Sequence, residues 1–297
     1  MSNHAKKPPV THVVVGDYHY TKKGVSRYDI SDPYHLAVRL SWPTFFALVL
    51  TIYLLVNFIF ASLYAIAPGS VAQARPGHFV DLLFFSFETL TTVGFGEMYP
   101  QGNAGHFIAS SEVFCGIWFM ALLTGLVFVR FSRPKSKFIV AAFPVVARFN
   151  GTPALMLRLA NGRATVLGQT EAKLSVLMLE QTEEGRNFRR AHSLKLERSH
   201  LPVFPLTWTI MHLIDATSPL FGMDEAAFVE GDTRLFLTLQ SHDPVLGTTV
   251  HDSRSYAPNT IKFGMRYEDV ISQAEDGSPI ADLTRISAIE PLNGHVQ

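Results

Sequence analysis

The sequence predicts a protein in two parts: a membrane-embedded helical part with two spans, followed by a β-sandwich. Hydrophobic residues make up 47% of the 297 residues and charged residues only 17%, which is unusually apolar for a soluble protein. Two long apolar runs lie in the first half, at residues 42–68 and 113–129. The second half instead alternates apolar and polar residues between turn sequences such as FNGTP, ANGRA and EDGSP, which is typical of antiparallel strands.

The first apolar run is long enough to cross a membrane as one helix. No Asp, Glu, Lys or Arg occurs between residues 40 and 74. At about 1.5 Å per residue, a helix over residues 42–67 exceeds the roughly 30 Å of hydrocarbon in a bilayer. The second run is marginal by itself, and it becomes adequate if its helix begins near His106 and includes Glu112. We therefore expect a multi-pass membrane protein.

Basic residues orient the two spans. They precede the first span and follow the second, whereas the connection between the spans holds only one. The residues before the first span are Lys22, Lys23, Arg27 and Arg39, those after the second are Arg130, Arg133, Lys135 and Lys137, and the one between is Arg75. Because cytoplasmic flanks carry the excess of Lys and Arg, both termini are expected in the cytoplasm. The formal net charge is zero, so a nucleic-acid partner is not expected.

A short apolar stretch lies between the spans, at residues 79–90. It is too short to cross a bilayer and too apolar for an exposed loop, which is typical of a re-entrant helix. Non-helical backbone at such a depth is tolerated only where protein buries it or where it lines a water-filled cavity. The sequence TTVGFG, which follows at residues 91–96, is predicted to be such a backbone.

This glycine-containing segment is predicted to bind potassium through backbone carbonyls. Rings of carbonyl oxygens can replace the water around the ion, and the TVGYG sequence is the established example of such a filter. The backbone must then alternate between right-handed and left-handed conformations. Gly94 and Gly96 can adopt the positive φ of the left-handed ones without a steric penalty. The side chains of Val93 and Phe95 would point away from the ion. The hydroxyl of Thr92 would add an oxygen at the inner end.

One such loop cannot close a ring of carbonyls. Because the chain has no second copy of the segment, a homotetramer with the pore on its fourfold axis is expected. The preceding helix would aim its C-terminal end, which is partially negative, at the cation. Glu88 and Thr91 are expected to support the filter. The alternative for Glu88 is that its carboxylate reaches water at the membrane interface. Potassium at the filter carbonyls is the only metal expected, and no cofactor is expected.

Four stretches together resemble one family. They are SWPTFF at 41–46, FFSFETLTTVGFG at 84–96, TGLVFVRFSRP at 124–134 and MHLIDATSPLFG at 211–222. Over most of its length, roughly residues 32–287, the chain resembles the KirBac family of bacterial inward-rectifier potassium channels. The resemblance implies a non-enzymatic, potassium-selective channel of the bacterial inner membrane, within the broad class of voltage-gated channels. Phe95 departs from the family pattern, because the commonest filter has tyrosine there and its hydroxyl bonds to the supporting shell.

The resemblance also implies how the domains are divided. Residues 1–41 would be a cytoplasmic N-terminus with an amphipathic slide helix at 32–40, and residues 42–134 would form the pore domain. Residues 135–297 would form an immunoglobulin-like cytoplasmic domain, to which the segment THVVV at 11–15 is expected to add a strand. His212 and Asp215 in that domain are expected to be a structural hydrogen-bonded pair and not a catalytic site.

Further implied roles concern the second span. Gly116 and Gly125 resemble hinge positions, although glycine in a membrane helix is as often a close-packing site. Phe128 matches the residue whose four copies form a hydrophobic constriction that gates by excluding water. Met120 lies where strongly rectifying relatives carry an acidic residue, so weak rectification is expected. Glu112 is expected to line the pore nearer the filter and to substitute in part for the missing carboxylate.

The basic residues after the second span have two interpretations. The resemblance implies that Arg130, Arg133, Lys135 and Lys137 bind anionic lipid headgroups, phosphoinositides among them, and bias the gate. The alternative is anchoring by positive charge at the cytoplasmic surface.

Two other functions remain open at this point. Phe95, with Glu97 just outside the filter, allows a less selective cation channel. The second alternative is a membrane-anchored sensor or binding protein, in which the β-sandwich carries the function. A mere anchor has no need of a re-entrant segment.

Overall fold

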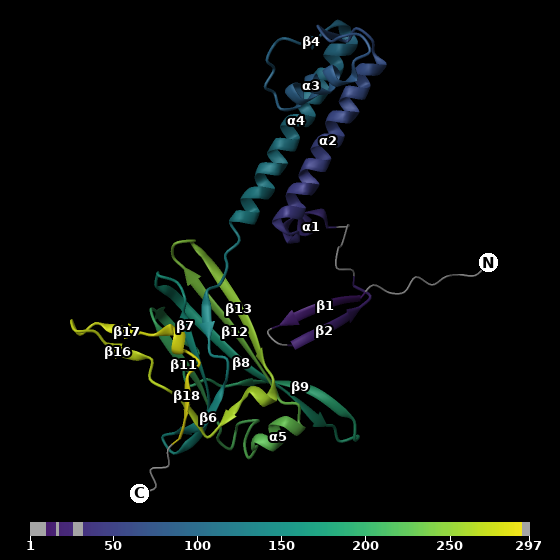
Figure 1. The fold of residues 1–297 in the computed structure, drawn as a ribbon. Helices are drawn as coiled ribbons and strands as arrows, with labels where there is room; N and C mark the ends of the chain where they lie inside the picture. The colour runs from purple at the N-terminus through teal and green to yellow at the C-terminus, as the bar shows by residue number, and fades with distance from the viewer. Residues whose placement is uncertain (1–9, 16–17, 26–31, 293–297) are drawn as a thin grey trace. The chain divides into compact units, whose positions relative to one another are not determined.

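The computed structural model describes residues 10–15, 18–25 and 32–292, which form two compact units (Figure 1). The helical unit comprises Tyr28–Arg133, and the β unit comprises Met1–Arg27 with Pro134–Gln297. This division falls after residues 27 and 133, whereas the domains expected from the sequence end at residues 41 and 134.

The helical unit contains four helices. They are α1 (Pro33–Arg39), α2 (Trp42–Ile66), α3 (Phe79–Leu90) and α4 (Gly102–Phe131). Asp32 caps α1 and Ser41 caps α2, each through its side-chain oxygen, and a proline occupies the first turn of both helices. These caps separate α1 from α2, although the chain is predominantly apolar throughout this region.

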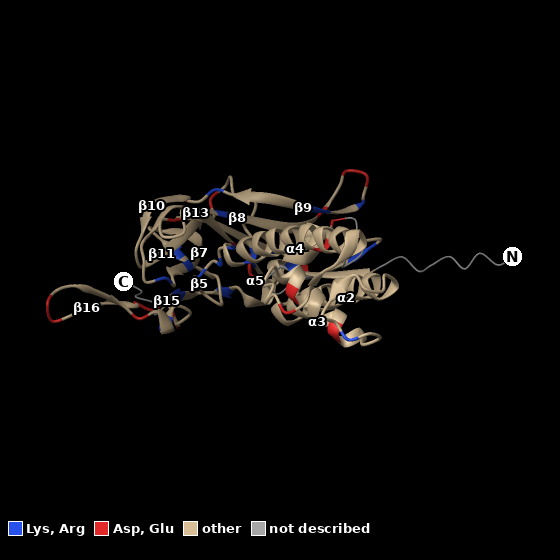
Figure 2. Ribbon diagram, turned by 90° about the horizontal axis from the view of Figure 1, so that it is seen from above, with Lys and Arg blue, Asp and Glu red and all other residues tan. Residues whose placement is uncertain are grey.

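Two of these helices are long and apolar enough to cross a membrane, α2 and α4. At about 1.5 Å per residue, their 25 and 30 residues correspond to about 37 and 45 Å. Figure 2 shows both ribbons almost free of charged residues. Helices that are apolar on all sides are stable in lipid and not in water, so these are the two spans that the sequence predicts.

The short helix α3 packs against the C-terminal half of α2 and the N-terminal half of α4. Phe85 of α3 lies in one apolar cluster with Phe60 and Tyr64 of α2 and with Ala109 of α4. Two short strands, β3 (Val71–Ala72) and β4 (Tyr99–Pro100), pair with each other. This pairing joins the chain that leaves α2 to the chain that follows the TTVGFG segment.

The β unit contains two five-stranded sheets. Its strands are β5 (Phe138–Val140), β6 (Val145–Phe149), β7 (Thr152–Asn161), β8 (Leu167–Gln181), β9 (Asn187–Leu194), β10 (His200–Phe204), β11 (Thr207–Leu213), β12 (Arg234–Asp243), β13 (Thr248–Tyr256) and β14 (Lys262–Phe263). One sheet has the order β10-β8-β12-β13 with β9 also on β8, and the other has the order β11-β7-β6-β14 with β5 also on β7. Pairing is antiparallel except between β14 and β6.

Alternating side chains build the core between the two sheets. Along β12, Leu235, Leu237 and Leu239 are buried, and the residues between them are more exposed. These leucines share one apolar cluster with Leu155 and Leu157 of β7, which belongs to the other sheet. The unit is therefore a β-sandwich, as the alternation in the sequence predicts.

Smaller elements lie around the sandwich. They are the helix α5 (Glu225–Glu230), the pair β15 (Met265–Tyr267) and β18 (Ile289–Pro291), and the pair β16 (Ile271–Gln273) and β17 (Pro279–Ala281). The strand β1 (Val10–Val15), which contains THVVV, pairs over six positions with β2 (Tyr18–Lys23) in a two-stranded sheet of their own. The expectation that THVVV joins the sandwich is therefore not met, because the local hairpin provides its partner.

Candidate ion-conduction site

The end of α3 holds the start of the TTVGFG segment. Thr91 caps the helix, since its amide and its hydroxyl both donate to the carbonyl of Phe87, at 3.2 and 2.6 Å. The carbonyl of Glu88 accepts from the amides of Val93 at 2.9 Å and Gly94 at 3.4 Å. The backbone of Glu88 thus holds the start of the segment through its carbonyl, whereas support by its carboxylate, which the sequence suggests, stays a prediction.

The backbone of the segment is left-handed at every second residue. Thr92, Gly94 and Gly96 have φ of 59°, 54° and 88°. Gly94 and Gly96 adopt the conformation that the alternating pattern requires of them. Thr92 was not expected to do so, because a β-branched residue is rarely found at positive φ. Strain of this kind persists only where the surrounding structure holds it, and it is concentrated at functional sites.

The side chains of the segment are exposed in the single chain. Val93 is 55% exposed and Phe95 is 79% exposed. Both are large apolar side chains, so this surface is one that a neighbouring copy or a lipid would cover.

Glycine allows α4 to approach the end of α3 closely. A Cβ atom at Gly116 would lie 2.0 Å from the carbonyl oxygen of Leu90, the last residue of α3. A Cβ atom at Gly125 would meet nothing within 4 Å. Of the two interpretations of these glycines, close packing fits Gly116, whereas Gly125 has free space around it.

Glu112 does not lie where the sequence analysis placed it. Its side chain is 0% exposed in the single chain. The hydroxyl of Tyr64 donates to Oε2 at 2.7 Å, and the hydroxyl of Ser86 lies against Oε1. Glu112 therefore faces α2 and α3 inside its own subunit, and the expectation that it lines the pore is wrong. Its position near the filter along the chain does not say which neighbouring helix its side chain meets.

Arg130 also has a different environment from the one expected. Its guanidinium donates to the carbonyls of Ala37 at 2.5 Å and Leu40 at 2.8 Å, where α1 ends. The same group lies 4.4 Å from the ring centre of Trp42 and 4.5 Å from that of Phe45. Arg130 thus joins α4 to the junction of α1 and α2. It is the least available of the four basic residues for a lipid headgroup.

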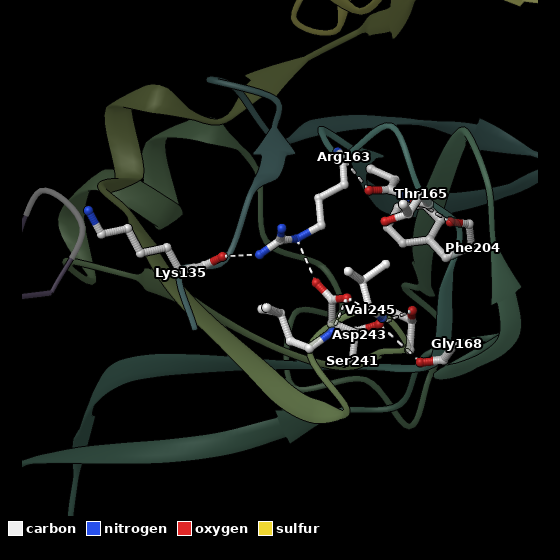
Figure 3. Close-up of polar contacts among 11 residues, drawn as sticks. Lys135, Arg163, Thr165, Gly168, Phe204, Ser241, Asp243 and Val245 are labelled. Atoms are coloured by element: carbon white, nitrogen blue, oxygen red, sulfur yellow. Dashed lines mark hydrogen bonds and ion pairs between the residues drawn. The ribbon is translucent and has the colours of Figure 1, made fainter. Parts of the chain in front are cut away.

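The other three basic residues have exposed side chains, and the backbone carbonyls of Lys135 and Lys137 accept hydrogen bonds from the sandwich. Arg133, Lys135 and Lys137 are exposed. Arg163 donates to the carbonyl of Lys135 at 2.6 Å and pairs at 2.9 Å with the fully buried carboxylate of Asp243 (Figure 3). The linker after α4 is therefore held by its main chain, and its basic side chains remain free.

Glycine is also required at this attachment. The amide of Gly162 donates to the carbonyl of Lys137 at 2.8 Å. A Cβ atom at Gly162 would lie 2.4 Å from that same oxygen. The ANGRA sequence indicates only a turn, and this attachment leaves no local signal because its partners are distant in the chain.

The remaining proposed pore residues lie on exposed parts of α4. Met120 is 51% and Phe128 is 69% exposed in the single chain. Voltage sensing finds no support in the spans, because α2 has no charged residue and α4 has only Glu112 and Arg130. In the described ranges, no group of three His, Cys, Asp or Glu side chains is placed to hold a metal ion.

His212 and Asp215 do not form the pair expected of them. His212 contacts the carbonyl of Lys195 and the hydroxyl of Ser218, both at 2.8 Å. Asp215 instead accepts from the hydroxyl and the amide of Thr217 at 2.7 and 2.8 Å. These hydrogen bonds lower the pKa of the Asp215 carboxyl. Both residues therefore stabilise the turn after β11, each with its own partners.

Two family models match the chain. The model described as "Inward rectifier potassium channel C-terminal domain" matches residues 138–294, within the β unit. The model described as "Ion channel" matches residues 48–133, within the helical unit. One match therefore falls in each unit of the structure.

Curated proteins show the same similarity. The chain is 32% identical over 286 residues to the inward rectifier potassium channel Kirbac3.1 of Paramagnetospirillum magnetotacticum, covering 96% of this chain and 97% of that protein. It is 30% identical over 209 residues to the human ATP-sensitive inward rectifier potassium channel 10, covering 67% of this chain and 55% of that protein. It is 25% identical over 214 residues to the mouse ATP-sensitive inward rectifier potassium channel 15, covering 69% of this chain and 57% of that protein.

Proposed function

The chain belongs to the inward rectifier potassium channel family, which is a family of ion channels and not of enzymes, and from this premise we propose how it conducts potassium. The filter is the backbone of residues 92–96, where carbonyls of Thr92 to Phe95 and the Thr92 hydroxyl replace the water around the ion. The observation that carries this proposal is the alternation of left-handed residues at Thr92, Gly94 and Gly96. The C-terminal end of α3 adds a partial negative charge that favours a cation.

We propose that four copies of the chain surround the pore. Each chain contributes one filter segment, and a closed ring of oxygens requires several. The exposed Val93 and Phe95 side chains would be covered by the neighbouring copies. Phe95 loses the hydroxyl of the commoner tyrosine, but the carbonyls on which selection depends belong to the backbone.

The inner end of α4 is proposed to be the gate. Phe128 is exposed, and four copies would form an apolar constriction that excludes water when it is narrow. Gly125 lies one turn earlier with open space around it, so we propose that α4 bends there. Met120 carries no charge that would attract a blocking cation, so weak rectification is expected. Steep outward block by internal spermine would contradict this part.

Anionic lipids are proposed to bind the exposed side chains of Arg133, Lys135 and Lys137. Each basic residue near an anionic leaflet contributes about 1 kcal/mol. The proposal places these residues and both termini on the cytoplasmic side of a bacterial inner membrane. Anchoring by positive charge alone remains the alternative, and it predicts no effect of lipid charge on flux.

Uptake of rubidium and sodium into liposomes tests the proposal. The purified protein is expected to admit rubidium, to exclude sodium and to be blocked by barium. Gly94→Ala should abolish the flux, since φ of 54° is strained for alanine. Gly77→Ala is the matched control, because Gly77 has φ of 79° in the loop before α3 and lies outside the filter.

Two other results would point to other functions. Equal uptake of both ions would indicate the less selective cation channel. Absence of flux in several lipid compositions would indicate the membrane-anchored sensor.

A further inference from the structure

Four polar side chains meet inside the helical unit, where α2, α3 and α4 pack together. They are Asn57, Tyr64, Ser86 and Glu112, and all four are buried. Among the described residues, the titratable groups that interact with Glu112 are two α2 tyrosines, Tyr64 and the more distant Tyr53. Within the described residues no Lys, Arg or His forms an ion pair with Glu112. A carboxylate here would be a buried charge without a countercharge.

The orientation of the Asn57 amide is fixed by its partners. Its nitrogen donates to the carbonyl of Tyr53 at 2.7 Å. The amide oxygen must then face Ser86, whose hydroxyl oxygen lies 3.0 Å away. The opposite orientation would place the amide oxygen against the carbonyl oxygen of Tyr53, which is a repulsive contact at 2.7 Å.

The hydroxyl of Ser86 is then surrounded by acceptors. It lies against Oε1 of Glu112, 3.0 Å from the side-chain oxygen of Asn57 and 3.2 Å from the Asn57 carbonyl. A hydroxyl has one proton to donate. If Glu112 were ionised, Ser86 could satisfy either the carboxylate or Asn57, and the other oxygen would face a lone pair.

One additional proton satisfies all of these contacts. With the proton on Oε1, Glu112 donates to Ser86, Ser86 donates to Asn57, and Asn57 donates to Tyr53. The hydroxyl of Tyr64 still donates to Oε2. A neutral acid also avoids the cost of burying an unpaired charge in a membrane segment, which is several kcal/mol.

We infer that Glu112 is a neutral carboxylic acid, and that it is a positioning residue for α3. Its hydrogen bond to Ser86 joins α4 to α3, and Ser86 joins α3 to α2. Ser86 lies two residues before Glu88, whose carbonyl holds the amides of Val93 and Gly94. The consequence for conduction rests on the proposed function of the filter, whereas the protonation state of Glu112 does not.

Infrared spectroscopy of the whole channel in lipid tests the protonation state. At neutral pH the spectrum should contain a carboxylic-acid C=O band that shifts in heavy water and is lost in Glu112→Gln. Glu88→Gln is the matched control, and the band should persist in it. A band that is present in both variants, or absent from the unmodified protein, would overturn the inference. This outcome does not depend on whether the channel conducts.

Flux measurements test the positioning role. Glu112→Gln preserves a donor toward Ser86 and should keep rubidium flux within about twofold of the unmodified protein. Glu112→Leu has a similar size and no donor, and flux or selectivity should fall at least about tenfold, which corresponds to the loss of about 1.4 kcal/mol.

The pH profile separates this role from a merely structural one. Flux through the unmodified protein should fall at high pH as Glu112 ionises, and Glu112→Gln should remove that fall. A flat profile in both proteins, or equal losses in Glu112→Gln and Glu112→Leu, would contradict the positioning role.

Discussion

Replacing Arg130 should loosen the junction between the short helix α1 and the two spans. Arg130→Met preserves the length of the side chain and removes its charge, its two hydrogen bonds and its stacking on Trp42 and Phe45. The carbonyls of Ala37 and Leu40 would lose a donor that is at present 2.5 and 2.8 Å away. Because this part of the helical unit is only partly buried, water can replace some of the lost contacts.

The magnitude follows from the contacts. Hydrogen bonds to a charged group contribute about 1.5–3 kcal/mol each, and partial exposure favours the lower end. Each cation–π contact at an exposed site adds about 0.5–1 kcal/mol. At their lower ends the two hydrogen bonds and two ring contacts give about 4 kcal/mol, and water can replace part of this loss, so we expect the free energy of unfolding to fall by about 2–4 kcal/mol in Arg130→Met. In Arg130→Lys we expect about half of that loss, because a lysine ammonium lacks the fork that reaches both carbonyls.

Unfolding in mixed micelles, followed by circular dichroism, provides the assay. A double-mutant cycle with Trp42→Leu should give a coupling of about 0.5–1 kcal/mol, since Arg130 contacts that ring. Arg133→Met is the control: its side chain is exposed, so stability should change by no more than about 0.5 kcal/mol while binding to anionic vesicles weakens. If Arg130→Met unfolds like the unmodified protein and weakens vesicle binding as much as Arg133→Met, the junction role is wrong.

Three further predictions concern packing and charge. Gly116→Ala should lower the free energy of unfolding by about 1–3 kcal/mol, because its Cβ would lie 2.0 Å from a carbonyl oxygen at the end of α3. Gly125→Ala should change it by no more than about 1 kcal/mol, and equal effects in thermal unfolding would refute the close-packing role. Asp243→Asn should cost about 3–5 kcal/mol in denaturant unfolding, since it leaves its arginine partner uncompensated, whereas Glu290→Gln in an exposed pair should cost at most about 1 kcal/mol. Hydrogen bonds lower the pKa of Asp215, so the stability that its carboxylate contributes is complete above the ordinary aspartate pKa of about 4 and is lost as the pH falls below that value. Asp215→Asn should therefore weaken the loss of stability at acid pH. An unchanged loss of stability at acid pH in this variant would contradict the prediction.

The helices of the pore part were predictable from the sequence because apolar length alone defines them. The re-entrant helix was expected at residues 79–90, and α3 is Phe79–Leu90. The second span was expected to begin near residue 106 and to include Glu112, and α4 is Gly102–Phe131. The four extra residues at its start include Gly105, at which a Cβ would lie 2.1 Å from the carbonyl oxygen of Ser70. Such a contact is tertiary and leaves no local pattern.

The partners of polar residues were the part that could not be predicted. Arg130 donates to carbonyls about ninety residues earlier, and Glu112 meets Tyr64 48 residues away. Sequence indicates that such residues are unusual in a membrane segment, but it does not indicate which helix face they meet. Asn57 was a missed signal, since it is the only amide in the apolar sequence of α2. Thr92 was identified as a filter residue, but its positive φ could not have been predicted, because a β-branched residue does not favour that conformation by itself.

The reversal potential under bi-ionic conditions measures whether the filter of residues 92–96 selects potassium over sodium. The purified channel would be placed in a planar bilayer with potassium on one side and sodium at equal concentration on the other. If the carbonyls of residues 92–95 select potassium, the reversal potential should lie far from zero. Its sign should be that expected when potassium, and not sodium, carries current out of its compartment. A potential near zero, with clear single-channel currents, would contradict selection by this filter.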